Sequence, residues 1–198
     1  MITAIGNVMR RAYEKGWITT RDGNVSLRRR NSNIMYITPS GWRKTIIHPE
    51  HMIKVRILQN GYKVPANTTP SGELEMHYLI QKNNKKTQAV VHLHPTNTIA
   101  AMYAGWDLQS ISAEFPEVSR YTRVGPIVPV LPVTSDALAT ATLAAMTDSD
   151  IGKVIYDIVG QKNHGVCAVG NDPWDAFEHV ERLEHICEIV LKSGKKIK

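Results

Sequence analysis

The stretch Gln88-Ala89-Val90-Val91-His92-Leu93-His94-Pro95 carries the strongest indication of the fold and lies near the middle of the chain. Its apolar and β-branched residues predict a buried strand over 88–94, which Pro95 ends because proline cannot donate to a strand ladder. Further short strands are predicted at 24–28, 34–38 and 53–58, and the first two are close enough to be hairpin neighbours. We therefore expect a largely antiparallel sheet around the central strand.

Helical segments alternate with these strands. Apolar residues recur at three- and four-residue spacing over 3–15 and again in a long segment that begins near Pro173, a residue favoured in the first turn of a helix. The other predicted elements are helices at 72–82, 96–104 and 135–146, an irregular proline-containing edge strand at 125–133 and a short strand at 166–169. This order predicts a three-layer α/β/α sandwich with a central, largely antiparallel sheet, formed by a single domain over residues 1–198.

The composition is that of an ordinary globular protein. The 198 residues are 42% hydrophobic and 21% charged, and no apolar run approaches the ~20 residues that span a bilayer. The two cysteines, Cys167 and Cys187, lie in apolar surroundings, which excludes a disulfide scaffold and favours a reducing cytoplasm. We expect a cytoplasmic protein with no membrane partner.

The formal charge of +6 is concentrated in two places. An early turn contains three arginines and the C-terminal tail contains four lysines, and removing these seven charges from +6 leaves −1. The seven residues are Arg28, Arg29, Arg30, Lys192, Lys195, Lys196 and Lys198. The rest of the chain has no basic stripe with interleaved aromatic residues, so nucleic acid is not an expected partner. The turn and the tail are predicted to be solvated.

His92 and His94 are the main candidates for metal ligands. Residues two apart on a strand project from the same face, so both imidazoles would point into one pocket, although two buried, hydrogen-bonded histidines are the alternative. A third histidine stands in a loop-like setting, Asn163-His164-Gly165, and three histidines leave an open position on the metal, as catalytic sites do. The other five histidines lack such a context, and His179 and His185 are predicted to be solvated on the last helix.

Small polar turns form a second group of candidates. The segments Gly23-Asn24-Val25-Ser26, Thr38-Pro39-Ser40-Gly41 and Thr69-Pro70-Ser71-Gly72 expose backbone N–H groups and hydroxyls, the donors that hold a phosphate. Glu73 follows the third turn directly, at the start of a predicted helix that Ser71 would cap. Taken alone, each turn is an ordinary turn and Glu73 an ordinary helix-start glutamate.

Taken in order, these segments resemble the class II aldolase/adducin family. The matching segments are Gly23-Asn24-Val25-Ser26, Ile37-Thr38-Pro39-Ser40-Gly41, Pro70-Ser71-Gly72-Glu73 with His77 four residues beyond, Ala89-Val90-Val91-His92-Leu93-His94 and Asn163-His164-Gly165-Val166. The resemblance implies a divalent metal, usually zinc with cobalt or manganese as alternatives, on His92, His94 and His164. It also implies that Glu73 serves as an acid/base or as a supplementary metal ligand, and that the protein is a homotetramer with active sites between subunits. The implied phosphate-binding residues are Asn24, Ser40, Gly41, Ser71 and Gly72.

The implied activity is that of a fuculose-phosphate aldolase-like enzyme. A phosphorylated ketose would be cleaved to dihydroxyacetone phosphate and an aldehyde through a metal-stabilised enediolate. The segment 110–117, Ser-Ile-Ser-Ala-Glu-Phe-Pro-Glu, lacks the tyrosine acid of fuculose-phosphate aldolases. Glu114 stands instead where the related methylthioribulose-phosphate dehydratases hold a glutamate, so it is either a catalytic acid/base or a plain loop carboxylate. A dehydratase, a 4-epimerase, a decarboxylase and a non-catalytic adducin-like module remain as alternatives.

Overall fold

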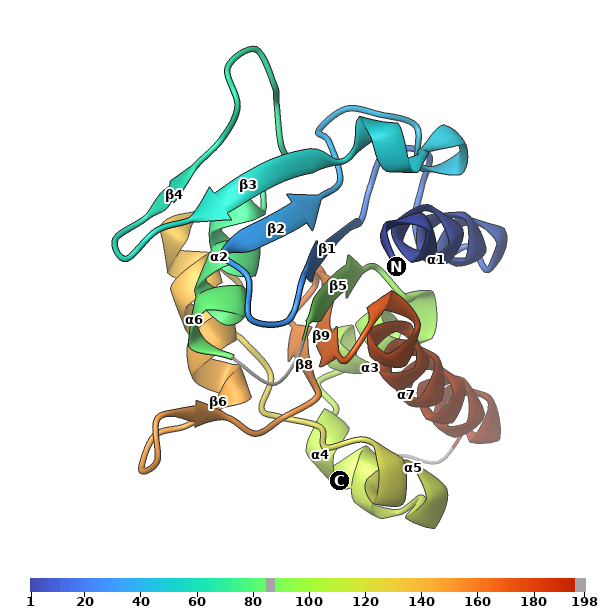
Figure 1. Ribbon diagram of the computed structural model, residues 1–198. Coiled ribbons are helices and arrows are strands. Elements are labelled where there is room, and N and C mark those ends of the chain that lie inside the picture. Colours follow the sequence, from blue (N-terminus) through green and yellow to red (C-terminus); the bar gives the residue numbers. More distant parts are fainter. Residues whose placement is uncertain (85–87, 195–198) are drawn as a thin grey trace.

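The computed structural model describes residues 1–84 and 88–194, and its centre is a seven-stranded sheet (Figure 1). The strand order is β4-β3-β2-β1-β5-β9-β8, and every neighbouring pair is antiparallel, as the sequence predicts. The strands are β1 (Asn24–Arg28), β2 (Ile34–Ile37), β3 (Ile53–Ile57), β4 (Tyr62–Lys63), β5 (Ala89–Leu93), β8 (Ile158–Gln161) and β9 (Gly165–Gly170). A separate hairpin pairs β6 (Thr147–Asp148) with β7 (Lys153–Val154).

Helices cover both faces of this sheet, which confirms the predicted three layers (Figure 1). One face carries α2 (Leu74–Asn83) and α6 (Asp136–Met146). The other carries α1 (Ile2–Glu14), α3 (Thr96–Tyr103) and α7 (Pro173–Ser193), and the short helices α4 (Leu108–Ala113) and α5 (Pro116–Tyr121) pack beside α7. Two 3₁₀ turns, η1 (Lys44–Ile46) and η2 (Pro49–His51), join β2 to β3. No helix of the described residues is both long and apolar enough to cross a membrane.

The position of β5 explains why the sequence around it dominates the fold. All five of its residues are buried, because β1 and β9 flank it and helices cover both of its faces. Asn24 of β1 lies opposite His92, and Cys167 of β9 lies opposite His92 on the other side. The end of β5 at His92 and Leu93 therefore lies beside residues of β1 and β9, so that three strands contribute residues to one end of the sheet.

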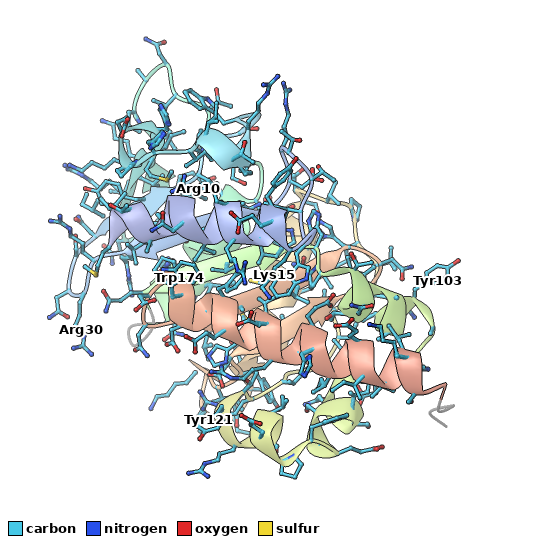
Figure 2. The ribbon with its side chains drawn as sticks, turned by 90° about the vertical axis from the view of Figure 1, so that its right-hand side faces the viewer. Arg10, Lys15, Arg30, Tyr103, Tyr121 and Trp174 are labelled. Atoms are coloured by element: carbon cyan, nitrogen blue, oxygen red, sulfur yellow. The ribbon has the colours of Figure 1, made fainter. Side chains whose placement is uncertain are left out.

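The long helix α7 forms where its capping residues predict it. The Asp172 carboxylate accepts hydrogen bonds from the amides of Trp174 and Asp175, and Gly194 ends the helix in the left-handed conformation. Beside it lies α1, and Lys15 between the two helices forms an ion pair of 2.8 Å with Glu181 (Figure 2). The two helices thus cover one face of the sheet together.

Two sequence predictions about local structure need correction, and several short elements were not predicted. The helix predicted at 72–82 begins at Leu74, because the Ser71 hydroxyl accepts the Glu73 amide and makes a turn there. Residues 125–133 lie beside β8 but form only an isolated bridge at Val128, with another at the preceding Val124, since Pro126 and Pro129 cannot donate to a ladder. The strands β4, β6, β7 and β8 and the helices α4 and α5 were not predicted, and their short segments show no clear periodicity.

The charged and histidine residues also differ from expectation in part. His185 is exposed as predicted, but His179 is buried, because α5 packs over it and its Nδ1 lies 2.9 Å from the Thr122 hydroxyl. Arg28 is half-buried rather than solvated, and its guanidinium donates to the Asn84 carbonyl at 2.7 Å. Lys192 is exposed and pairs with Glu188, whereas Lys195, Lys196 and Lys198 lie outside the described residues.

A buried carboxylate fixes the start of α3, the helix that directly follows His94 and Pro95. Glu184 of α7 is 3% exposed, and its two oxygens accept hydrogen bonds from the backbone amides of Asn97 and Thr98 and from both their side chains, at 2.7–2.9 Å. These bonds satisfy amide groups that the first turn of a helix leaves unpaired. Glu184 therefore anchors the segment after β5 to α7.

We expect Glu184→Ala to lower the free energy of unfolding by roughly 2–4 kcal/mol, because four donors, two of them buried, lose a charged acceptor. Denaturant titration measures this loss. Glu181→Ala, on the same helix, removes only the half-exposed ion pair with Lys15 and serves as the control, with an expected loss below about 1 kcal/mol. Equal losses in the two variants would show that Glu184 does not anchor α3.

Candidate active site

A cleft of about 380 Å³ opens at the end of β5 where His92 and His94 lie. It brings together nearly every residue that the sequence singled out, although these come from five separate segments of the chain. The residues lining it are Arg21, Asp22, Gly23, Asn24, Pro39, Ser40, Gly41, Lys44, Ser71, Gly72, Glu73, His92, His94, Val133, Thr134 and His164. Only Glu114, of the predicted site residues, is not among them.

The three histidines form a compact cluster in the cleft. Their ring centroids are 4.8–5.1 Å apart, and one nitrogen from each can be chosen so that all three nitrogens lie within 4.8 Å of one another. His92 Nδ1 lies 3.0 Å from the Val166 carbonyl, an acceptor, so it must carry the proton, and His92 Nε2 is left with a lone pair. His94 Nε2 lies 3.0 Å from that atom, and the buried His164 Nδ1 has no hydrogen-bond partner.

These features fit a divalent metal. A buried nitrogen without a partner, as at His164, is unfavourable unless a ligand reaches it, and the other two imidazoles present nitrogens to the same point. Burial lowers the pKa of His92 well below its usual value and that of His94 to about 4, and it also lowers the pKa of His164. The imidazoles are therefore neutral at pH 7, which is the form that binds metal.

The backbone on both sides of the cluster holds the ligands in place. The His94 amide donates to the Trp17 carbonyl at 2.9 Å, and Asn163 adopts a positive φ of 58° in the turn that presents His164. The next residue, Gly165, has no room for a side chain: an added Cβ would collide with the Leu93 carbonyl and lie 2.8 Å from His94 Cδ2. Glycine is thus required where β9 passes the ligands.

Gly165→Ala should therefore lower metal affinity by roughly 10- to 100-fold, the usual cost of disturbing the surroundings of a ligand. The added methyl group would push the His94 ring away from its position. Metal titration against a chromophoric chelator measures the effect. An unchanged affinity in a folded variant would mean that the ring positions are not held by this contact.

Glu73 lies next to this cluster as the N-cap residue of α2. It is 7% exposed, and its Oε1 accepts the Thr134 amide at 3.0 Å, which fixes the carboxylate at the wall of the cleft. The Glu73 charge opposes the lowering of the pKa of His164, so the two groups are close. Glu75 lies outside the cleft and forms a hydrogen bond with Tyr62 instead, and together with burial it raises the pKa of that tyrosine.

The two Thr-Pro-Ser-Gly turns are paired with each other in space. The Ser40 amide donates to the Thr69 carbonyl at 2.9 Å, and the Ser71 amide donates to the Thr38 carbonyl at 3.0 Å. This pairing, which the sequence could not show, brings Ser40, Gly41, Ser71 and Gly72 to one side of the cleft.

His77 positions Asn24, a role that the sequence did not reveal. The imidazole is fully buried, which lowers its pKa to about 3, and it lies between the Ser26 hydroxyl at 2.8 Å and Asn24 Oδ1 at 2.5 Å. Because Asn24 Oδ1 can only accept, His77 Nε2 donates to it. The amide group of Asn24 is thereby oriented, and its NH₂ remains available to a ligand.

Glu114 lies elsewhere in the fold. It is exposed and follows α4 as its C-terminal cap residue, and it does not line the cleft of its own chain. Besides Val133, four further residues of the cleft were not predicted: Arg21, Asp22, Lys44 and Thr134. Thr134 acts through its backbone amide and the other three stand outside any recognised motif, so no sequence signal marks them.

The sequence profile of the class II aldolase and adducin N-terminal domain matches residues 3–191. The chain belongs to the class II aldolase and adducin family. An L-fuculose phosphate aldolase of Methanococcus maripaludis (strain C5) is 29% identical over 177 residues, covering 89% of this chain and 88% of that relative. A methylthioribulose-1-phosphate dehydratase of Yersinia pestis (strain Pestoides F) is 29% identical over 189 residues, covering 89% and 80%.

The structure of a family member confirms the fold. A sugar-phosphate aldolase from Thermotoga maritima superimposes with a TM-score of 0.80 over 99% of this chain and 97% of that one, at 24% identity. Relatives in this family include both aldolases and dehydratases that act on sugar phosphates. Class II aldolases use a divalent metal, and the three histidines form a group that could hold one.

Proposed function

We propose that the protein is a metal-dependent aldehyde-lyase that cleaves a phosphorylated ketose, resembling L-fuculose 1-phosphate, to dihydroxyacetone phosphate and an aldehyde. One observation carries this proposal: the three histidines, Glu73 and the paired polar turns line a single cleft. A metal site, an acid/base and an anion-binding wall are the three parts that such a cleavage needs. A module that only binds partners would need none of them.

The metal would be held by His92, His94 and His164, and zinc suits an all-imidazole site of three ligands with an open position. When bound, such an ion supplies Lewis-acid chemistry, polarising oxygens of the substrate and offsetting negative charge as it develops. The neutral state of the three imidazoles and the fixed tautomer of His92 prepare the chain for that role.

Glu73 would carry the proton in the reaction. Thr134 holds one carboxylate oxygen, Oε1, so the other oxygen can face the substrate from a fixed position. As a base Glu73 would take the hydroxyl proton of the carbon whose bond breaks, and as an acid it would return a proton to the three-carbon product. Burial beside the cluster keeps bulk water from competing for these steps.

The paired turns would orient the substrate through its phosphate. The hydroxyls of Ser40 and Ser71 and the backbone amides of Gly41 and Gly72, with the oriented amide of Asn24, offer donors on one side of the cleft. Fixing the phosphate end places the reacting carbons near Glu73, and such positioning contributes much of the rate enhancement of enzymes.

A dehydratase acting on a sugar phosphate is the second candidate. It is favoured by Glu114 and by the similarity to a methylthioribulose-1-phosphate dehydratase. Because Glu114 does not reach the cleft of its own chain, its participation requires a neighbouring subunit, as in a homotetramer with active sites between subunits. We propose that the working enzyme is such a homotetramer in the cytoplasm. Light scattering measures the number of subunits.

A product-resolved screen tests the function. Ketose 1-phosphates and 5-phosphates are incubated with protein loaded with zinc, cobalt or manganese, and products are identified by mass. We expect dihydroxyacetone phosphate and an aldehyde, with no reaction in the metal-free protein. A product that is lighter by one water would favour the dehydratase, and an isomer of unchanged mass would indicate an epimerase.

A further inference from the structure

Lys44 is a buried cation in the wall of the cleft that the function above does not yet use. Its residue is 2% exposed, and it lines the cleft together with the two polar turns and His94. Among the residues that the structure describes, no carboxylate forms an ion pair with it. Burying a charge that no ion pair neutralises is costly, so its presence calls for an explanation.

The ammonium of Lys44 holds the first Thr-Pro-Ser-Gly turn from inside. Its Nζ donates to the Trp42 carbonyl at 3.2 Å and, more weakly, to the Pro39 carbonyl at 3.5 Å, which lie on either side of Ser40 and Gly41. Its own amide donates to the Thr20 carbonyl at 2.8 Å, in the loop that leads to Asn24. Lys44 thus joins two of the segments that line the cleft.

The Lys44 ammonium has one N–H donor left for a ligand. An ammonium carries three N–H donors, and the carbonyls of Pro39 and Trp42 occupy two of them. Burial lowers the pKa of Lys44, and the nearby negative charge of Asp22 counteracts this only in part. An anion in the cleft would stabilise the charged form and complete the set of acceptors.

We propose that Lys44 is the cation that neutralises the phosphate of the substrate and holds the 39–42 turn in its anion-binding conformation. The inference deepens the proposed function and rests on it for the identity of the ligand. From the sequence alone, phosphate binding was expected from the uncharged polar turns only. A buried lysine next to backbone amides and hydroxyls gives a binding site for a dianion rather than for a neutral sugar.

Calorimetric titration with inorganic phosphate tests this without turnover. Wild type, Lys44→Met, Lys44→Arg and Lys54→Met are compared at equal metal content; Lys54 is an exposed lysine on β3, outside the cleft, and serves as the control. We expect Lys44→Met to weaken phosphate binding by roughly 10- to 100-fold, the usual effect of losing a charge-assisted hydrogen bond. Lys44→Arg should lose less, and Lys54→Met should bind like wild type.

A second measurement covers the case in which Lys44→Met fails to fold. In wild-type protein with ¹⁵N-labelled lysine, phosphate should shift one side-chain signal, the one that is missing from Lys44→Arg. Phosphate binding within twofold of wild type in folded Lys44→Met, an unmoved Lys44 signal, or no phosphate binding by wild type would each overturn the inference. Lys44-dependent phosphate binding without cleavage of any ketose phosphate would leave the inference standing and refute the proposed reaction.

Discussion

His94→Ala is expected to abolish both metal binding and activity while the fold survives. The substitution removes one of three ligands, and affinity should fall by more than roughly 100-fold, since loss of a residue that merely supports a ligand already costs 10- to 100-fold. The fold should survive because the His94 side chain is partly exposed and its one hydrogen bond is to His92. The alanine amide can still donate to the Trp17 carbonyl.

Elemental analysis after dialysis, together with circular dichroism, measures both parts of this prediction. His185→Ala is the matched control, because His185 is an exposed histidine of α7 that lies outside the cleft. It should retain the metal content and activity of wild type. Full metal content in His94→Ala would show that the ligand assignment is wrong, and unfolding would show that the histidine serves the core instead.

Glu73→Gln is expected to keep the metal and lose most of the turnover. The glutamine oxygen can still accept the Thr134 amide, so the geometry of the wall is preserved, but the amide cannot take up and return a proton. General acid/base groups contribute roughly 10²–10⁴-fold to rate, and kcat should fall by that factor. Steady-state kinetics at matched metal content provide the measurement.

The control for Glu73→Gln is Glu75→Gln, two residues along the same chain segment. Its carboxylate forms a hydrogen bond with Tyr62 and does not line the cleft, so kcat should stay close to that of wild type. Near-normal turnover in Glu73→Gln would remove Glu73 from the mechanism. Loss of metal in the same variant would assign it a ligand role in place of proton transfer.

The sequence predicted the parts of this molecule that depend on local patterns. The buried run ending at Pro95, the early hairpin strands and the capped helix from Pro173 all form within a few residues of their predicted bounds. His92 and His94 share a face because alternate residues of a strand must do so. That His164 joins them was predicted from its setting in the Asn-His-Gly turn and from the family resemblance.

What could not be predicted depends on contacts between distant segments. Lysine usually lies on the protein surface, but Lys44 is buried where the 19–23 loop and the 39–42 turn approach each other. His179 lies on a helix flank that would be solvated if α5 did not cover it. Glu184 likewise finds its four donors 86 and 87 residues earlier in the chain. Periodicity and propensity carry no information about such partners.

X-ray absorption at the metal edge of the purified, zinc-titrated protein tests the central claim, that the three histidines form the metal centre of a lyase. We expect one zinc ion per chain with three imidazole nitrogens at about 2.0–2.1 Å and no sulfur ligand. Zinc bound at well below one ion per chain, or a sulfur signal from a cysteine, would contradict it.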